Sequence, residues 1–198
     1  MKTLKLIAVL ALAGLVSACA DARIASRNAP FEPVTPGVLG PTIPSVAVND
    51  IRVRVPKRLR VSEANSYYPS GDIVWRGEPL GDRHQQVAQV MYDGLNKGAS
   101  TLTGATTVDL DVEVLRFHGL SEKARYSTGG VHNITFALQI RDAETGALIS
   151  EPRVVEADLR AFGGLEAIAA DNRGETQRVR IVEHLSRVIQ TELTTEEG

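Results

Sequence analysis

Regularly spaced carboxylates are the first residues in this chain that could bind a metal ion. Asp109, Asp111 and Glu113 alternate with apolar residues in the stretch 107–117, so they lie on one face of a predicted strand. Neighbours on such a face are about 7 Å apart, and carboxylate oxygens are the ligands of hard cations. Metal sites gather ligands from several segments, however, and the EF-hand spacing is absent. We therefore interpret the row as the solvated face of a sheet.

Two histidines offer a second candidate for metal binding. His118 and His132 flank the loop 119–130 and would be near neighbours if their two strands pair directly. A pair of histidines lacks the three or four ligands that zinc requires. We expect no metal here.

Nucleophiles and phosphate-binding loops are not evident in the sequence. The Gly-x-Ser-x-Gly motif is absent, and the glycine pairs 129–130 and 163–164 do not open a helix with the spacing of a phosphate-binding loop. We expect no catalytic residue, no cofactor and no enzymatic activity.

The position of the single cysteine in the sequence indicates how it is modified. Cys19 follows a basic start and an apolar run over residues 6–16, which are the parts of a secretory signal. That run is shorter than the roughly 20 residues of a membrane-spanning helix. The stretch 15–19 resembles the lipobox of bacterial lipoproteins. The alternative is a plain secretory signal that happens to end near a cysteine.

The lipobox resemblance implies a signal peptide over residues 1–18 and cleavage between Ala18 and Cys19. It also implies a diacylglyceryl group on the Cys19 thiol and a further acyl chain, such as palmitate, on its amine. Ala20 stands where an aspartate would favour retention in the inner membrane. We therefore expect a lipid anchor on the periplasmic face of the outer membrane.

A tether is predicted between the lipid and the folded domain, over residues 19–44. Five prolines in this stretch exclude a helix or a strand: Pro30, Pro33, Pro36, Pro41 and Pro44. A flexible tether of about 25 residues reaches roughly 25–30 Å. A disordered tail without a spacing role is the alternative.

Composition excludes nucleic acid as a partner and indicates one further domain. The chain has 22 Lys and Arg against 24 Asp and Glu, with no basic stripe. Residues 45–198 are enough for one periplasmic domain of ordinary size.

The periodicity of residues 45–198 predicts an α+β domain. Strands are expected at 46–55, 72–77, 107–117, 134–140 and 148–161, and helices at 82–98 and 175–193. We expect Gly98 to end the first helix as a left-handed cap and Gly94 to mark its packing on the sheet. The expected fold is a two-layer domain, with a mostly antiparallel sheet of about four to six strands and two helices on one face.

Aromatic and arginine residues form the candidate interaction surface, because both types are enriched in binding hot spots. The group consists of Tyr67, Tyr68, Trp75, Arg76, Arg125 and Tyr126. In the alternative, Trp75 is a core residue and the tyrosines cover its edge.

Several stretches resemble an uncharacterised family of alphaproteobacterial lipoproteins that contains a domain of unknown function. They are residues 59–69, 72–77, 81–84 and 116–118. The lipobox, tether and element order also resemble, more loosely, the auxiliary lipoproteins of ABC-type and lipid-transport systems.

These observations together predict a non-enzymatic, membrane-anchored lipoprotein. We expect it to bind an envelope protein partner or to serve as an auxiliary subunit of an envelope assembly or transport system. A protein that binds lipid or a small amphiphile is the alternative, and an envelope enzyme is a third possibility.

Overall fold

A computed structural model describes residues 45–194 of the protein. The predictions for the signal peptide, Cys19 and the tether lie outside the described residues. The elements are β1 (Val46–Arg54), β2 (Ile73–Val74), α2 (Arg83–Ala99), β3 (Thr106–His118), α3 (Glu122–Arg125), β4 (Gly130–Asp142), β5 (Arg153–Glu156), β6 (Leu159–Ala161), α4 (Gly164–Asn172) and α5 (Gln177–Thr194).

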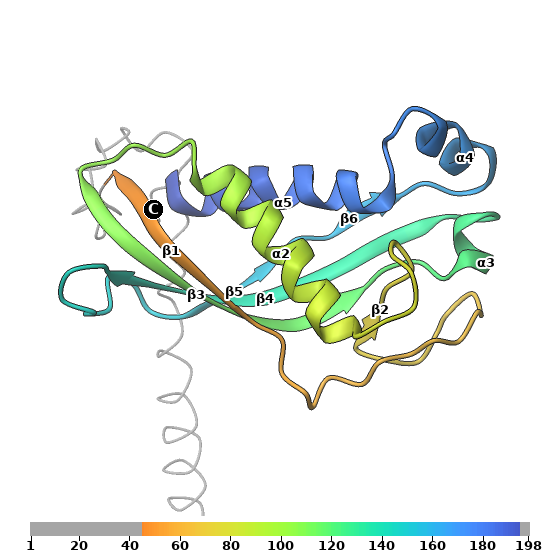
Figure 1. The fold of residues 1–198 in the computed structure, drawn as a ribbon, viewed down its shortest axis with the longest axis horizontal. Coiled ribbons are helices and arrows are strands. Elements are labelled where there is room, and N and C mark those ends of the chain that lie inside the picture. Colours follow the sequence, from red (N-terminus) through yellow and green to blue (C-terminus); the bar gives the residue numbers. More distant parts are fainter. Residues whose placement is uncertain (1–44, 195–198) are drawn as a thin grey trace, which may run out of the picture. The chain divides into compact units, whose positions relative to one another are not determined.

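Six strands form one sheet around the long strands β3 and β4 (Figure 1). β1 and β2 both run parallel to β3, with Val46 opposite Thr106 and Val74 opposite His118. β4 is antiparallel to β3, and β5 and β6 are both antiparallel to β4. Parallel strands need a long crossover, and α2 provides the one between β1 and β3. The α+β prediction is confirmed, with a mostly antiparallel open sheet.

The predicted strand at 148–161 is divided into β5 and β6. Between them, the Asp158 carboxylate accepts a hydrogen bond from the backbone N–H of Ile134 at 3.1 Å. It also accepts one from the Asn133 side chain at 2.8 Å. A side chain thus takes the place of a strand partner, and the regular ladder stops there.

Helices α2 and α5 cross each other (Figure 1), and two glycines of α2 allow them to pack closely. A Cβ at Gly94 would lie 2.7 Å from the Leu185 Cβ, and one at Gly98 would overlap the Ser186 carbonyl oxygen. Our predictions for both glycines were therefore wrong. Gly94 faces a helix rather than the sheet, and Gly98 lies inside α2, which continues to Ala99.

Both helices cover the apolar face of the sheet. The side chains that they bury with β3 and β4 are almost all completely inaccessible: Val87, Val90, Met91, Leu95, Leu110, Val114, Phe136, Leu138, Ile181, Leu185 and Ile189. Within residues 45–194, no helix covers the other face of the sheet. None of the helices within residues 45–194 has the length and apolar character that crossing a bilayer requires.

The two ends of the sheet are distinguished by the segments that lie there. The chain enters at Ser45, beside the start of β3, and we call this the entry end. α3 follows the other end of β3, which we call the distal end (Figure 1). Since β3 has 13 residues, the two ends are separated by about 40 Å of extended strand.

We predict that Gly98→Ala destabilises the domain although alanine is the better helix former. The overlap with α5 should lower the free energy of unfolding by about 1–3 kcal/mol. Urea unfolding of the purified protein measures this change. Asn96→Ala, on the exposed side of the same helix, should change it by less than about 0.5 kcal/mol. A gain in stability for Gly98→Ala would show that the helices are not in close contact there.

Candidate functional site

The acidic residues of β3 lie on the helix-free face of the sheet and pair with arginines. Arg52 of β1 donates to Asp111 at 2.7 Å and to Asp109 at 3.1 Å. Arg141 of β4 donates to Asp111 from the other side at 2.9 Å. The hydrogen bond from Arg52 is the main reason that the pKa of Asp111 lies below its usual range. Asp111 is therefore ionised, and both Asp111 and Asp109 are already paired with arginines, so they are poor candidates for a metal site or a general base.

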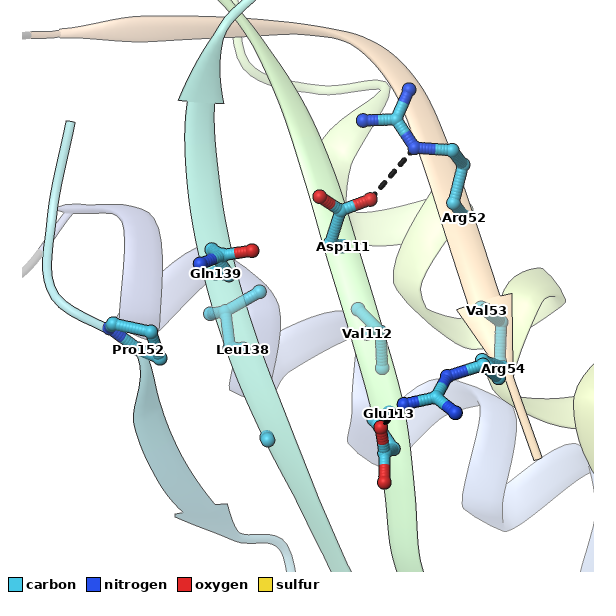
Figure 2. A pocket seen from close by; sticks show the side chains of 10 residues that line it. Arg52, Val53, Arg54, Asp111, Val112, Glu113, Leu138, Gln139 and Pro152 are labelled. Carbon is cyan, nitrogen blue, oxygen red and sulfur yellow. Dashed lines mark hydrogen bonds and ion pairs between the residues drawn. The ribbon is translucent and has the colours of Figure 1, made fainter. Parts of the chain in front are cut away.

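A shallow groove of about 590 Å³ crosses the same face (Figure 2). Arg54 and Arg58 both pair with Glu113 at its side, and Ala137 is the smallest of its lining residues. Because the arginines and carboxylates neutralise each other, the groove presents an ionic surface without a free reactive group.

The two histidines do not form a joint site. His118 lies opposite Asn133 in the β3–β4 register and therefore shares its face, whereas His132 points to the other face. His132 is completely buried, and neither ring nitrogen has a hydrogen-bond partner among the described residues. Burial, with smaller contributions from Arg180 and Arg125, lowers the pKa of His132 to about 3. His132 is thus neutral at physiological pH.

The segment 63–71, which we call the tyrosine loop, is seated on α3 at the distal end. The backbone N–H of Lys123 donates to the Asn65 side chain at 2.7 Å. The hydroxyl of Ser121 donates to a backbone carbonyl of the loop at 2.6 Å. The Lys123 ammonium lies 4.6 Å from the centre of the Tyr67 ring. A segment without regular secondary structure is thereby held in one place.

A buried arginine fixes the other side of the tyrosine loop. Arg83, only 3% exposed, donates to Glu63 at 2.7 Å and to Gln86 at 2.6 Å. Arg76 donates to the second oxygen of Glu63 at 2.6 Å. The hydrogen bond from Arg83 is the main cause that lowers the pKa of Glu63. Our sequence reasoning missed this pair, although Arg83 stands four residues before Val87 on the apolar stripe of the helix.

The structure corrects one member of the candidate interaction surface. Trp75 is only 1% exposed, and its ring packs edge-on against Phe117 with 5.5 Å between centroids. Trp75 is therefore a core residue, as in the alternative that we considered. Tyr67 and Tyr68 remain on the surface, and Tyr68 is 93% exposed.

Three of the predicted residues surround one hollow of about 230 Å³. Arg76, Arg125 and Tyr126 line it, together with Asp171 and Gln177, which the sequence analysis did not single out. The Arg125–Asp171 ion pair links α3 to α4. The sequence pattern could have indicated that Gln177 is buried, because it stands four residues before Ile181 on the apolar stripe of α5.

We call Tyr67, Tyr68, Arg76, Arg125 and Tyr126 the distal cluster. Its members come from the tyrosine loop, the chain after β2, and α3 with the residue that follows it. The cluster combines exposed aromatic rings with arginines held by ion pairs. This arrangement is suited to binding.

We predict that Glu63→Gln destabilises the protein by about 1–3 kcal/mol at pH 7, because it removes a carboxylate from a buried arginine. The folded state depresses the pKa of Glu63 below its ordinary value of 4.5. The ion pair thus contributes its full stability above pH 4.5 and loses it as the pH falls below that value. Urea unfolding at pH 7 and well below pH 4.5 should therefore show a difference that shrinks in acid.

The matched control for this change is Glu144→Gln in the exposed β4–β5 hairpin, which should have little effect at either pH. An unchanged difference between wild type and Glu63→Gln at both pH values would mean that the pair acts through packing and not through charge.

Comparison with solved structures gives matches of low identity. A candidate lipoprotein from Caulobacter crescentus CB15 is 12% identical, with a TM-score of 0.36 over 77% of this chain and 90% of that chain. A DUF330 protein from Xanthomonas campestris is 10% identical, with a TM-score of 0.38 over 78% and 86% of the two chains. PelC from Paraburkholderia phytofirmans, solved as a dodecamer, is 7% identical, with a TM-score of 0.35 over 75% and 89%.

No curated protein matches the sequence. Residues 46–198 match the profile of a protein family described as a family of unknown function. The match covers all the described strands and helices, including the tyrosine loop and the hollow beside α3. The chain therefore belongs to the DUF6778 family.

Proposed function

We propose that this protein is a non-enzymatic lipoprotein of the cell envelope that presents the distal cluster to a partner protein. The observation that carries the proposal is the position of the cluster. It lies at the distal end, about 40 Å along β3 from Ser45, where the chain enters the domain. A domain anchored through its N-terminus would thus carry its aromatic surface away from the point of attachment.

The sequence before Ser45 supports the anchor. The lipobox resemblance implies lipid on Cys19, and a tether of about 25 residues adds roughly 25–30 Å of reach. We propose attachment to the periplasmic face of the outer membrane. The loose resemblance to transport auxiliary lipoproteins supports a role as an auxiliary subunit of an envelope assembly or transport system.

The fixed conformation of the distal cluster supports recognition of a partner. The Lys123 ammonium lies over the Tyr67 ring, and the Glu63–Arg83 pair fixes the base of the loop that carries Tyr67. A surface that is ordered before binding loses less conformational entropy when a partner arrives. Tyrosine and arginine also provide large contact areas with polar ends.

The packing of the domain favours a protein partner over an amphiphile. Binding of an amphiphile would need space between the helices and the sheet, but the side chains there are fully buried, including Met91, Leu95 and Phe136. The groove on the helix-free face is lined by charged pairs, which suits neither an acyl chain nor an apolar ring.

We predict that Tyr67→Ala combined with Tyr68→Ala removes the partner while the fold is retained. The tagged full-length protein would be purified from gently solubilised membranes of the native bacterium, and co-purifying proteins quantified by mass spectrometry. One envelope protein should fall by at least tenfold in the double variant. Tyr92→Ala, a change at the exposed tyrosine of α2, should leave it unchanged. Equal recovery of that envelope protein with the wild type, the double variant and Tyr92→Ala would contradict the proposed surface.

We also predict that Cys19→Ala abolishes labelling of the protein with palmitate. The thioether and amide linkages that carry the lipid cannot form without the cysteine. Metabolic labelling measures this effect. A wild-type protein without label would favour the plain secretory signal instead.

A further inference from the structure

His132 is a titratable side chain of the interior that the proposed function does not use. It lies near the start of β4, is completely inaccessible, and has no hydrogen bond on either ring nitrogen within residues 45–194. A Cβ at Gly119 would lie 3.7 Å from the His132 Nδ1 and 3.6 Å from the Trp75 ring. His132 therefore lies where the main core, to which Trp75 belongs, meets the chain that leads into α3.

Residues 120–131 and 159–173, which include α3, β6 and α4, form a small body beside His132 that we call the distal lobe. The lobe has an apolar cluster of its own, separate from the main core, which consists of Leu120, Ala124 and Ala161. The Arg125–Asp171 ion pair joins α3 to α4. β6 pairs with β4 over three positions, and His132 occupies one of them. Because it buries so little apolar surface, the lobe opens more easily than the main core.

Two arginines from different elements act on the His132 ring. Arg125 acts from α3 and Arg180 from α5, and both oppose a positive charge on the imidazole. The cavity that both arginines line has a volume of about 10 Å³. Such a space holds one water at most, so a counter-anion does not fit between them. A proton on His132 would therefore add a third positive charge to the interior without a hydrogen-bond acceptor.

The acidic side chains nearby act on the arginines and not on the ring. Asp171 of α4 pairs with Arg125. Two glutamates are attracted to Arg180 and are paired with other arginines: Glu166 and Glu175. Arg160 of β6 points to the other face of the sheet, because its partner in β4 precedes His132 by one residue. Among the described groups that act on His132, none is a carboxylate that would stabilise the protonated ring.

Acid therefore opposes the closed state of the lobe. Burial, with smaller contributions from the two arginines, lowers the pKa of His132 from 6.5 to about 3, and exposure to water would restore the ordinary value. A base whose pKa is lower in the closed state favours that state fully above pH 6.5, and the advantage is lost as the pH falls below that value. Each further unit of acidification favours opening about tenfold, down to the pKa of the closed state.

We propose that His132 is a proton-sensitive latch, which keeps the distal lobe closed at neutral pH and releases it in acid. The neutral ring packs in the interior, whereas the protonated ring must reach water, and the lobe opens before the main core does. Arg125 and Tyr126 of the distal cluster belong to the lobe, so its release would separate them from Tyr67 and Tyr68. The latch goes beyond the proposed function, because it operates whether or not a partner binds.

Hydrogen exchange followed by mass spectrometry tests the latch. The full-length protein in detergent would be labelled at about pH 7.5 and about pH 5, with labelling times corrected for the intrinsic effect of pH on exchange. We expect the protection of backbone amides in the distal lobe to fall about 30-fold at the lower pH. Amides of α2 and β1 should keep their protection. Both conditions lie above the ordinary pKa of Glu63, 4.5, so the Glu63–Arg83 pair remains intact.

Variants assign the response to one ring. His132→Leu keeps an apolar side chain in the interior and removes the proton site, so the protection of its lobe should change less than about twofold between the two conditions. His84→Gln, in α2, is the matched control and should respond as the wild type does. If His132→Leu does not fold, the wild-type ring provides the second readout. The carbon-13 NMR signal of labelled His132 should remain that of a neutral imidazole in the folded protein down to about pH 5.

Four results would overturn the proposal. The first is an equal loss of protection in the wild type and in His132→Leu. The second is a wild-type lobe that loses no protection, or loses it together with the main core. The third is a His132 ring that becomes protonated near its ordinary pKa while the lobe stays closed. The fourth concerns His184 of α5, whose pKa is also lowered by burial: a response abolished by His184→Leu and kept in His132→Leu would place the sensor there.

Discussion

The two-faced character of β3 is the constraint on which the rest of the domain depends. Its residues alternate between buried aliphatic side chains and carboxylates, and both of its edges are paired. A shift of one residue in its register would bury Asp109, Asp111 and Glu113 and expose the aliphatic row. The register of the sheet is therefore strongly determined. The helices must lie on the aliphatic face, and the other face must remain in contact with water.

The two faces stabilise the domain in different ways. On the covered face, apolar burial provides most of the stability, and Gly94 and Gly98 allow α2 and α5 to approach each other closely. On the open face, ion pairs such as Arg52–Asp111 are partly exposed and contribute little energy each, about 0–1 kcal/mol. Their more important effect is to make the uncovered face strongly hydrophilic, which opposes unspecific association.

Order at the distal end comes from a third source, which is polar contacts between segments without regular structure. The chain between β1 and α2 includes only the two residues of β2 as a strand, and it is held by Glu63, Arg83 and the buried Trp75. α3 is a helix of only 4 residues. The hydroxyl of its N-cap, Ser121, and the backbone N–H of Lys123 donate hydrogen bonds to the tyrosine loop. Such a region opens more easily than the core. It is also where side chains from distant parts of the sequence meet.

Periodicity by itself determined the elements and the fold class. Alternation of large apolar residues with polar or small residues predicted β1, β3 and β4, and apolar stripes of helical spacing predicted α2 and α5. Both patterns depend on residues only a few positions apart. Which surfaces meet was decided by tertiary structure. The roles of Gly94 and Gly98, the burial of Trp75, and the meeting of Arg76 with Arg125 and Gln177 all depend on contacts between distant segments. No local pattern encodes those distances, since they follow from the pairing and packing of the whole chain.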